Sequence, residues 1–296
     1  PTAMHMAIAI RAKGKLIPNL KLLNLQLKKK TKEFNEKFIW YKLLSKYYTL
    51  DLKSQPDLVF FGSFNKANQC LYRSVPRVFC RTEIEADYGK SEYDFRFSDC
   101  DESQYNSYYH HNNIVQEWVE ESIIGGASGE FLKLQNKTKT KFCNFIYSNN
   151  IRDSQVRIDF AKKLMEYKMV DCPSKSLNNM KNFGKKNSSD GIREKLSFVS
   201  NYKFTIAFEN TSLKNYCTEK LLHPLAVRSI PVYWGDTSIN EKLNPKSFIN
   251  CHDYASFDDV IQHIIDVDKN DKLYKEYINS NIFLESSCPP GFLNIE

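Results

Sequence analysis

The sequence predicts an α/β protein built from two Rossmann-like lobes that face a cleft. Three observations lead to this prediction. Short apolar segments of strand length alternate with helical segments, which is typical of parallel β-α-β units. These segments form two series, and a polar stretch near residues 130–140 separates them. The length of 296 residues is comfortable for two domains. We therefore expect an amino-terminal lobe at 1–130 and a carboxyl-terminal lobe at 131–296.

The first series contains three runs with the length and aromatic content of strands. They are DLVFFGSF at Asp57–Phe64, RVFCRTE at Arg77–Glu83 and YDFRF at Tyr93–Phe97. Ahead of them, the leucines, lysines and aromatic residues of Lys21–Tyr48 predict one or two amphipathic helices.

The second series contains four strand candidates: Phe142–Ser148, Tyr202–Phe208, Ile230–Trp234 and Phe248–Asn250. A helix is predicted over Ser154–Tyr167, and another over Ser256–Val267, where Ser256 and Asp259 have the spacing of a capping box. The Asn- and Lys-rich stretch Pro173–Ser189 is predicted to be an exposed loop. Ligands of such folds bind at the carboxyl ends of strands, so the chemistry is expected in the loops that follow them.

Charge is distributed unevenly along the chain. The net charge is +7, but residues 1–77 carry 15 basic and 4 acidic side chains, and residues 78–130 carry 3 and 12. A basic amphipathic segment at 21–48 could contact an anionic membrane peripherally. The alternative is an ordinary surface helix with extended lysines. Nucleic acid is not expected as a partner, because no recognised nucleic-acid-binding pattern accompanies the basic residues.

Membrane spanning and secretion are also not expected. No window approaches the roughly twenty consecutive apolar residues of a transmembrane helix. The eight cysteines are evenly spread and include no C-x-x-C pair, which favours buried reduced thiols in the cytoplasm over a disulfide framework. We expect a cytoplasmic protein, with any membrane contact at the inner face.

The segment after the strand at 202–208 could hold an anion. A polar loop leads to Thr218, which can cap a helix whose amino end attracts negative charge, and Lys220 lies in the first turn. A lysine placed against the helix dipole suggests a bound anion, although it could equally be a surface lysine. The chain has no G-x-G-x-x-G and no P-loop.

Three ordered blocks extend this signal: YKFTIAFEN at 202–210, NYCTEKLLHPLAVRSIPVYWGD at 215–236 and PKSFINCHDY at 245–254. Together they closely resemble the donor-binding half of the family-10 alpha-1,3/4-fucosyltransferases. A weaker likeness covers PDLVFFGSF at 56–64, RVFCRTEIE at 77–85 and the segment 142–160. The resemblance implies a GT-B enzyme that uses GDP-fucose, inverts the anomeric centre and needs no obligatory metal.

The resemblance also implies roles for individual residues. Arg157 and Lys220 would hold the diphosphate, and Glu219 would bind the ribose hydroxyls. The remaining donor-site residues would be Tyr216, Asn149, and the pair Glu209 and Asn210 near the fucose. The acceptor would be an N-acetyllactosamine-like glycan, fucosylated through an alpha-1,3 linkage at GlcNAc or Glc.

Glu83 matches the family's acidic residue after the R-V-F strand, which would be the general base. The chemistry accounts for these residue types, because a carboxylate must take the acceptor proton while cations stabilise the charge on the departing diphosphate. Glu85, two residues further on, is the rival base. Arg81-Thr82 stands where the family usually has a glycine before the acid, so the loop conformation stays open.

Metal chemistry has weaker signals. Asp99-Cys100-Asp101 is a D-x-D, but three residues within an acidic run more often form a solvated loop. The pairs His110-His111 and His252-Asp253 have no third ligand spaced nearby. Two alternatives to a fucosyltransferase stay open: another nucleotide-sugar transferase acting on a surface polysaccharide, and a glycan-binding relic of the fold.

Overall fold

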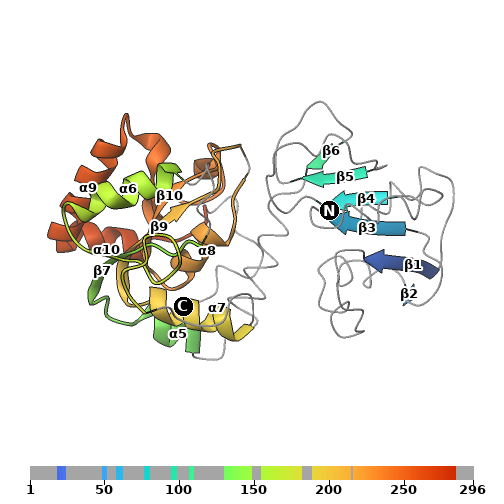
Figure 1. The fold of residues 1–296 in the computed structure, drawn as a ribbon, viewed down its shortest axis with the longest axis horizontal. Helices are drawn as coiled ribbons and strands as arrows, with labels where there is room; N and C mark the ends of the chain where they lie inside the picture. Colours follow the sequence, from blue (N-terminus) through green and yellow to red (C-terminus); the bar gives the residue numbers. More distant parts are fainter. Residues whose placement is uncertain are drawn as a thin grey trace. The chain divides into compact units, whose positions relative to one another are not determined.

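The computed structural model describes six short strands between residues 19 and 109 as backbone, and describes residues 130–148, 155–181, 189–214 and 216–284 more fully. The chain divides into two compact units, residues 1–115 and 116–296. Figure 1 shows the strands of the first unit and the helices and strands of the second. The boundary proposed at 130/131 stays a prediction; helix α5 begins at Glu130.

The first unit contains a parallel sheet in the order β2-β1-β3-β4-β5-β6. All its strand pairs run parallel. The strands are β1 (Asn19–Asn24), β2 (Thr49–Asp51), β3 (Leu58–Gly62), β4 (Arg77–Cys80), β5 (Phe95–Ser98) and β6 (Ser107–Tyr109). The three strands predicted from sequence in this unit are confirmed as β3, β4 and β5.

The helix predicted from Lys21 is wrong over its first residues. Residues Lys21–Asn24 belong to β1, which pairs with β2 and β3 on its two sides. Two partner strands form hydrogen bonds with the backbone N–H and C=O groups of the NLKLLN run. A hydrophobic pattern within the run cannot reveal these partners, because they lie elsewhere in the sequence. Residues 25–48, the rest of the proposed membrane-contacting segment, lie outside the described residues.

The second unit is organised around a parallel sheet in the order β11-β10-β9-β7-β8. Its strands are β7 (Lys141–Asn144), β8 (Val170–Asp171), β9 (Tyr202–Phe208), β10 (Ile230–Trp234) and β11 (Ile249–Asn250). Every pairing is parallel. Strand β9 is central and almost wholly buried, which explains its continuous apolar sequence.

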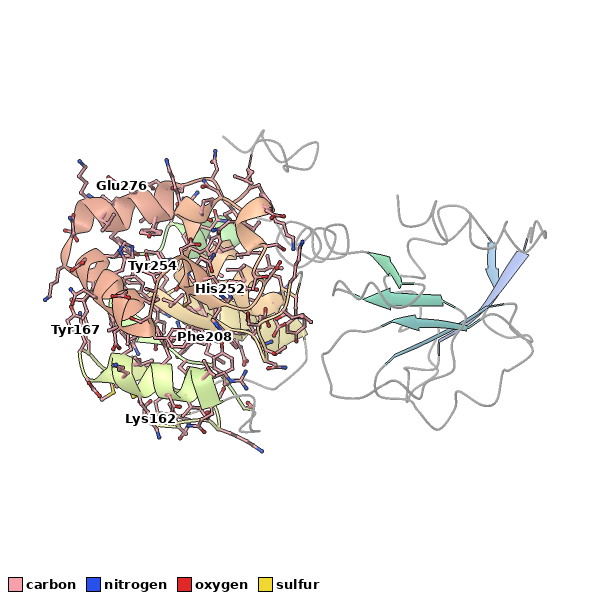
Figure 2. All side chains as sticks on the ribbon, turned by 90° about the horizontal axis from the view of Figure 1, so that it is seen from above. Lys162, Tyr167, Phe208, His252, Tyr254 and Glu276 are labelled. Atoms are coloured by element: carbon pink, nitrogen blue, oxygen red, sulfur yellow. The ribbon has the colours of Figure 1, made fainter. Side chains whose placement is uncertain are left out.

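Helices cover both faces of this sheet. They are α5 (Glu130–Gln135), α6 (Gln155–Met165), α7 (Ser189–Val199), α8 (Glu219–Ala226), α9 (Phe257–Lys269) and α10 (Asp271–Asn279). Phe204, Ile206 and Phe208 pack with residues of α6, α9 and α10, whereas Ala207 packs with α8. Figure 1 shows α6, α9 and α10 on one side of the sheet and α5 and α7 on the other. Figure 2 places Phe208 in the interior, with Lys162 and Glu276 on outer helices.

The local start signals of two helices are confirmed. Thr218 is the N-cap of α8. Ser256 is the N-cap of α9, where its hydroxyl accepts from the Asp259 amide and donates to the Asp259 carboxylate. The described part of the stretch predicted as an exposed loop has no helix or strand, but Pro173 and Ser176 are buried in it, and α7 already begins at Ser189.

Four cysteines, Cys143, Cys172, Cys217 and Cys251, are buried free thiols, as predicted. Burial raises the pKa of each of them, so they serve as small apolar core residues. Within the described part of the chain, no helix has the length and apolar character needed to cross a bilayer.

Candidate active site

The loop that leaves β9 carries a buried carboxylate. Glu209 follows Phe208 directly, and its amide donates to the Trp234 carbonyl at 2.8 Å, so the loop starts alongside β10. The Glu209 side chain has no exposed surface. An enclosed carboxylate needs several donors, because burial of an unpaired charge is costly.

Thr218 supplies two of those donors at the start of α8. Its amide donates to Glu209 Oε1 at 2.7 Å. Its hydroxyl lies 2.9 Å from Oε1 and 2.8 Å from Oε2. The same hydroxyl accepts from the Lys220 amide as the N-cap. The carboxylate of one loop therefore fixes the first residue of the next helix.

Lys220 lies within the same group of contacts. Its ammonium is 3.2 Å from Glu209 Oε2 and 3.6 Å from Glu219 Oε1. It also donates to the Thr218 hydroxyl at 3.0 Å. Burial opposes the charge on Lys220, but Glu209 and Glu219 together raise its pKa well above the usual value. Lys220 is a fixed cation of which 18% stays exposed.

Arg157 brings a second cation to this region from the first turn of α6. Its Nη1 donates to Asn210 Oδ1 at 3.0 Å. The guanidinium carbon lies 4.3 Å from the centre of the Tyr147 ring, a cation–π contact. Burial lowers the pKa of Arg157, and Tyr147, Glu209 and Tyr216 act in the opposite direction. The Arg157 residue is only 2% exposed.

Tyr147 anchors that arrangement to the sheet. Its hydroxyl donates toward the Ile206 and Phe208 carbonyls and accepts from the Phe208 amide. Tyr147 follows β7, so it ties the carboxyl end of β7 to the carboxyl end of β9. Sequence analysis missed it, although it lies in the apolar run that predicted the strand.

Glu219 and Tyr216 complete the group. Burial works against ionisation of Glu219, but Lys220, Lys195 and His223 outweigh it and lower its pKa to about 2. Tyr216 is buried, and its carbonyl accepts from the Tyr233 hydroxyl at 3.2 Å. Lys195 comes from α7 and was not identified from sequence, because nothing in its local pattern distinguishes it from other surface lysines.

The structure thus brings together six of the predicted donor-site residues. These are Arg157, Glu209, Asn210, Tyr216, Glu219 and Lys220. They come from the loop after β9, the start of α8 and the first turn of α6, at the carboxyl ends of parallel strands. Asn149, Glu83 and Glu85 lie outside the described residues, so their assignments stay predictions.

His252 borders this region without showing a metal-site arrangement. Its Nε2 lies 3.3 Å from the Ser212 hydroxyl and near the Gly235 backbone, and its ring stacks on Trp234. Figure 2 labels this residue in the second unit. Across the described residues, no three His, Cys, Asp or Glu side chains are grouped as metal ligands. Asp99 and Asp101 lie outside that part of the chain.

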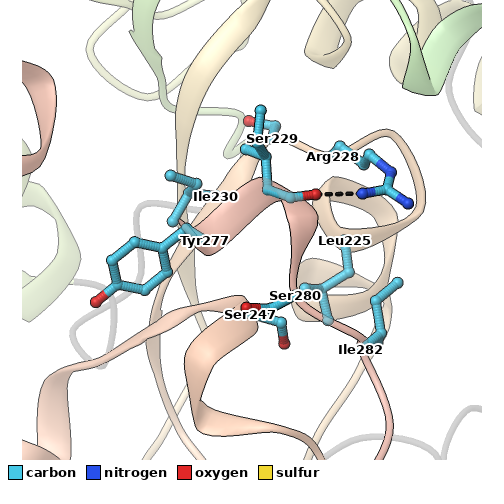
Figure 3. A pocket seen from close by; sticks show the side chains of 9 residues that line it. Leu225, Arg228, Ser229, Ile230, Ser247, Tyr277, Ser280 and Ile282 are labelled. Carbon is cyan, nitrogen blue, oxygen red and sulfur yellow. Dashed lines mark hydrogen bonds between the residues drawn. The ribbon is translucent and has the colours of Figure 1, made fainter. Parts of the chain in front are cut away.

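A small hollow occurs at the opposite end of β10 (Figure 3). It is lined largely by apolar and hydroxyl side chains, among them Leu225, Ile230, Ser247, Tyr277 and Ile282. The guanidinium of Arg228 donates to the Ile278 carbonyl there. Because the Arg228 guanidinium is already bound to a backbone carbonyl, this hollow is a weaker candidate active site than the cluster around Lys220.

The half of the chain that carries this cluster is similar to a known protein family. Residues 136–282 match the model of the glycosyltransferase family 10 (fucosyltransferase) C-terminal domain. The chain belongs to glycosyltransferase family 10. The family-10 match begins just before β7 and ends after α10, so it contains all six donor-site residues that the structure brings together.

Two relatives are similar in sequence to this family-10 chain. A protein of Acanthamoeba polyphaga mimivirus with a provisional fucosyltransferase name is 37% identical over 154 residues, 50% of this chain and 25% of that one. The alpha-(1,3)-fucosyltransferase FucT of Helicobacter pylori is 28% identical over 287 residues, 84% of this chain and 58% of that one. The chain therefore spans less than two thirds of these relatives.

The structural likeness extends over most of the chain. A crystal structure of an alpha1,3-fucosyltransferase with GDP-fucose matches with a TM-score of 0.70 at 24% identity, covering 92% of this chain and 85% of that one. The fold is therefore the GT-B glycosyltransferase fold, as predicted. The cleft between the lobes stays a prediction.

Proposed function

We propose that this family-10 chain transfers L-fucose from GDP-fucose to a sugar hydroxyl. The observation that carries the proposal is the pairing of a buried cation, Arg157, and a half-buried one, Lys220, with Asn210 and Glu219 at the carboxyl ends of the strands. A nucleoside diphosphate needs such cations when no glycine-rich phosphate loop is present. The names of the relatives support fucose as the sugar.

The proposed reaction inverts the anomeric carbon. A carboxylate takes the proton of the acceptor hydroxyl as its oxygen bonds to C1 of fucose, and the bond from C1 to the diphosphate breaks with GDP as the leaving group. Arg157 and Lys220 stabilise the charge that grows on the diphosphate. Glu219 binds the ribose hydroxyls, Tyr216 and Asn149 contact the donor, and Glu83 is the base, with Glu85 as its rival.

The proposed acceptor is GlcNAc or Glc of a lactosamine-type glycan, fucosylated through an alpha-1,3 linkage. The H. pylori relative is named for this linkage. No obligatory metal is proposed. A divalent-ion dependence of transfer, abolished by EDTA, would count against that part of the proposal.

The test is a transfer assay with the whole chain and a panel of nucleotide sugars. We expect turnover of GDP-fucose with N-acetyllactosamine, and NMR of the product should show the alpha-1,3 linkage with inverted configuration. Faster turnover of another nucleotide sugar would replace fucose as the donor and favour the polysaccharide-transferase alternative. Binding of GDP-fucose or glycan without any turnover would favour the glycan-binding relic.

We also propose a cytoplasmic location with peripheral membrane contact through residues 25–48, the part of the predicted segment that follows β1. The support is the excess of basic residues in 1–77, which an anionic lipid surface would attract. Sedimentation with phosphatidylserine liposomes should show binding that weakens with salt. Equal sedimentation with neutral and anionic liposomes would contradict it.

A further inference from the structure

Glu209 is the most enclosed charged group near the proposed diphosphate site. Its carboxylate has no exposed surface, and both oxygens have partners within 3.2 Å. All of these partners belong to Thr218 and Lys220. A sugar bound outside could contact the carboxylate only if these bonds were given up. The geometry therefore disagrees with the role near the fucose that family resemblance implies for this residue.

We propose that Glu209 is a positioning residue that holds Lys220 toward the diphosphate, and that it does not contact the fucose. This inference rests on the proposed function, because it assigns how one of the two diphosphate-binding cations is held. Glu209 then acts on the reaction indirectly, through the side chain of Lys220.

The donor capacity of Lys220 supports the assignment. An ammonium has three N–H groups on a flexible four-carbon stem. In Lys220, Glu209 Oε2 at 3.2 Å and the Thr218 hydroxyl at 3.0 Å take two of them. Two fixed bonds determine where the ammonium lies, so little side-chain freedom remains to be lost when an anion binds.

The backbone around Glu209 provides independent support. A Cβ at Gly235 would lie 2.5 Å from Glu209 Cγ and 2.9 Å from Glu209 Cβ, which no real side chain tolerates. It would also lie 2.7 Å from the Tyr233 hydroxyl. The loop after β10 therefore needs a glycine at position 235, because Cβ and Cγ of Glu209 occupy the space that a side chain there would fill.

A positioning role predicts that replacing Glu209 lowers kcat but leaves the Kd of GDP and of GDP-fucose nearly unchanged. Glu209 offsets part of the positive charge of Lys220, so Glu209→Gln makes the site more positive and should not weaken ground-state binding of GDP. The amide carries no charge, however, and it has an NH2 donor in place of one of the two acceptor oxygens that Thr218 and Lys220 use. Lys220 is therefore held less firmly in its position. Small displacements of a catalytic cation reduce transition-state stabilisation more than substrate binding. A direct contact to fucose predicts the opposite, a loss in affinity for GDP-fucose relative to GDP.

The experiment compares Glu209→Gln with the wild type in transfer kinetics and calorimetric titration of GDP and GDP-fucose. We expect kcat to fall at least tenfold, with the Kd of both ligands within threefold of wild type. Asp268→Asn is the matched control. It removes another buried carboxylate that pairs with lysines, at the opposite end of β9, and should leave kcat within twofold.

Gly235→Ala tests the same role without changing a charge. We expect it to displace Glu209 and reduce kcat in the same direction, and this variant decides the question if Glu209→Gln does not fold. Unchanged kcat in whichever variants fold would overturn the positioning role, as would a tenfold selective loss of GDP-fucose affinity in Glu209→Gln. Absence of turnover by the wild type itself would instead overturn the proposed function, and this role with it.

Discussion

Lys220 and Arg157 differ in how their charges are supported. Lys220 is balanced by two carboxylates, at 3.2 and 3.6 Å. Arg157 is held by an amide oxygen and an aromatic face, neither of which carries a full charge. Glu209 also acts on the charge of Arg157 and favours its ionised form. Each cation should contribute to diphosphate binding in its own way.

Substitution of either cation should weaken GDP binding. We expect Lys220→Ala to raise the Kd of GDP at least tenfold, about 1.4 kcal/mol. Arg157→Lys should also weaken it, because an ammonium cannot reproduce the planar contact with Tyr147 and the bond to Asn210 together. Titration calorimetry measures both. Lys272→Ala, on exposed α10, is the control, and equal GDP affinity in all three variants would contradict the assignment.

Asp268 supports a prediction on pH dependence. Its carboxylate, 4% exposed, accepts from Lys168, Lys203 and the Tyr167 hydroxyl. Burial acts against its ionisation, but these partners lower its pKa below the ordinary 3.8. A carboxylate with a lowered folded-state pKa stabilises the fold above its unfolded pKa, and this stabilisation is lost as the pH falls through the folded value.

We therefore expect Asp268→Asn to reduce the free energy of unfolding by about 1–2 kcal/mol at pH 7, since the lysines can still turn toward water. The difference from wild type should shrink as the pH falls below about 3.8. Urea unfolding at several pH values measures it. A difference that stayed constant down to acid pH would show that the lost contact is not the ionised carboxylate.

The donor-half residues were predictable because they lie in ordered blocks that resemble a known family, and the chemistry accounts for their types. Glu209, Asn210, Tyr216, Glu219 and Lys220 lie within twelve residues of one another, so sequence alone could group them. The burial of Glu209 could not be predicted, because it depends on Gly235 and Thr218 approaching from other loops. Tyr147 and Lys195 were missed for the same reason: their partners are distant in sequence.

At the scale of elements, the strongest predictions concerned segments whose signals are local. Helix α9 begins where Ser256 and Asp259 form the predicted cap, and β9 and β10 have the bounds that their apolar runs indicated. Residues Lys21–Asn24 of β1 were wrongly predicted as helix because the stability of this strand depends on β2 and β3, which come later in the chain. The two-residue strand β8 was not predicted and depends on its neighbour β7 in the same way, whereas β11 lies within the predicted strand Phe248–Asn250.

The N-cap of α9 should contribute measurably to the free energy of unfolding. Ser256→Ala removes the hydroxyl that accepts from the Asp259 amide, and we expect a loss of about 1 kcal/mol in the free energy of unfolding. Asp258→Asn is the control, because this neighbouring carboxylate is exposed and pairs with Lys163 only at the surface, so its loss should cost less than about 0.5 kcal/mol. Thermal or urea unfolding compares the two. Equal effects would mean that the hydroxyl does not cap the helix.

At the scale of the whole molecule, the proposed work is divided between the two units. The six assembled donor-site residues all belong to the unit at 116–296, whereas Glu83 and Glu85 belong to the unit at 1–115. The acidic stretch 78–130 contains the proposed base in its sequence, and its negative charge suits a neutral sugar acceptor better than an anionic one. Donor binding and proton abstraction should therefore respond separately to mutation.

This separation gives the prediction that decides the identity of the base. Glu83→Gln should reduce transfer by about 10²- to 10⁴-fold, the usual contribution of a general base, and leave the Kd of GDP-fucose within twofold, because no donor-site residue changes. Glu85→Gln should retain most of the activity. Transfer kinetics and titration of both variants measure the two effects side by side. The reverse pattern would assign the base to Glu85, and loss of donor binding in Glu83→Gln would show that this residue acts on the donor and not on the acceptor hydroxyl.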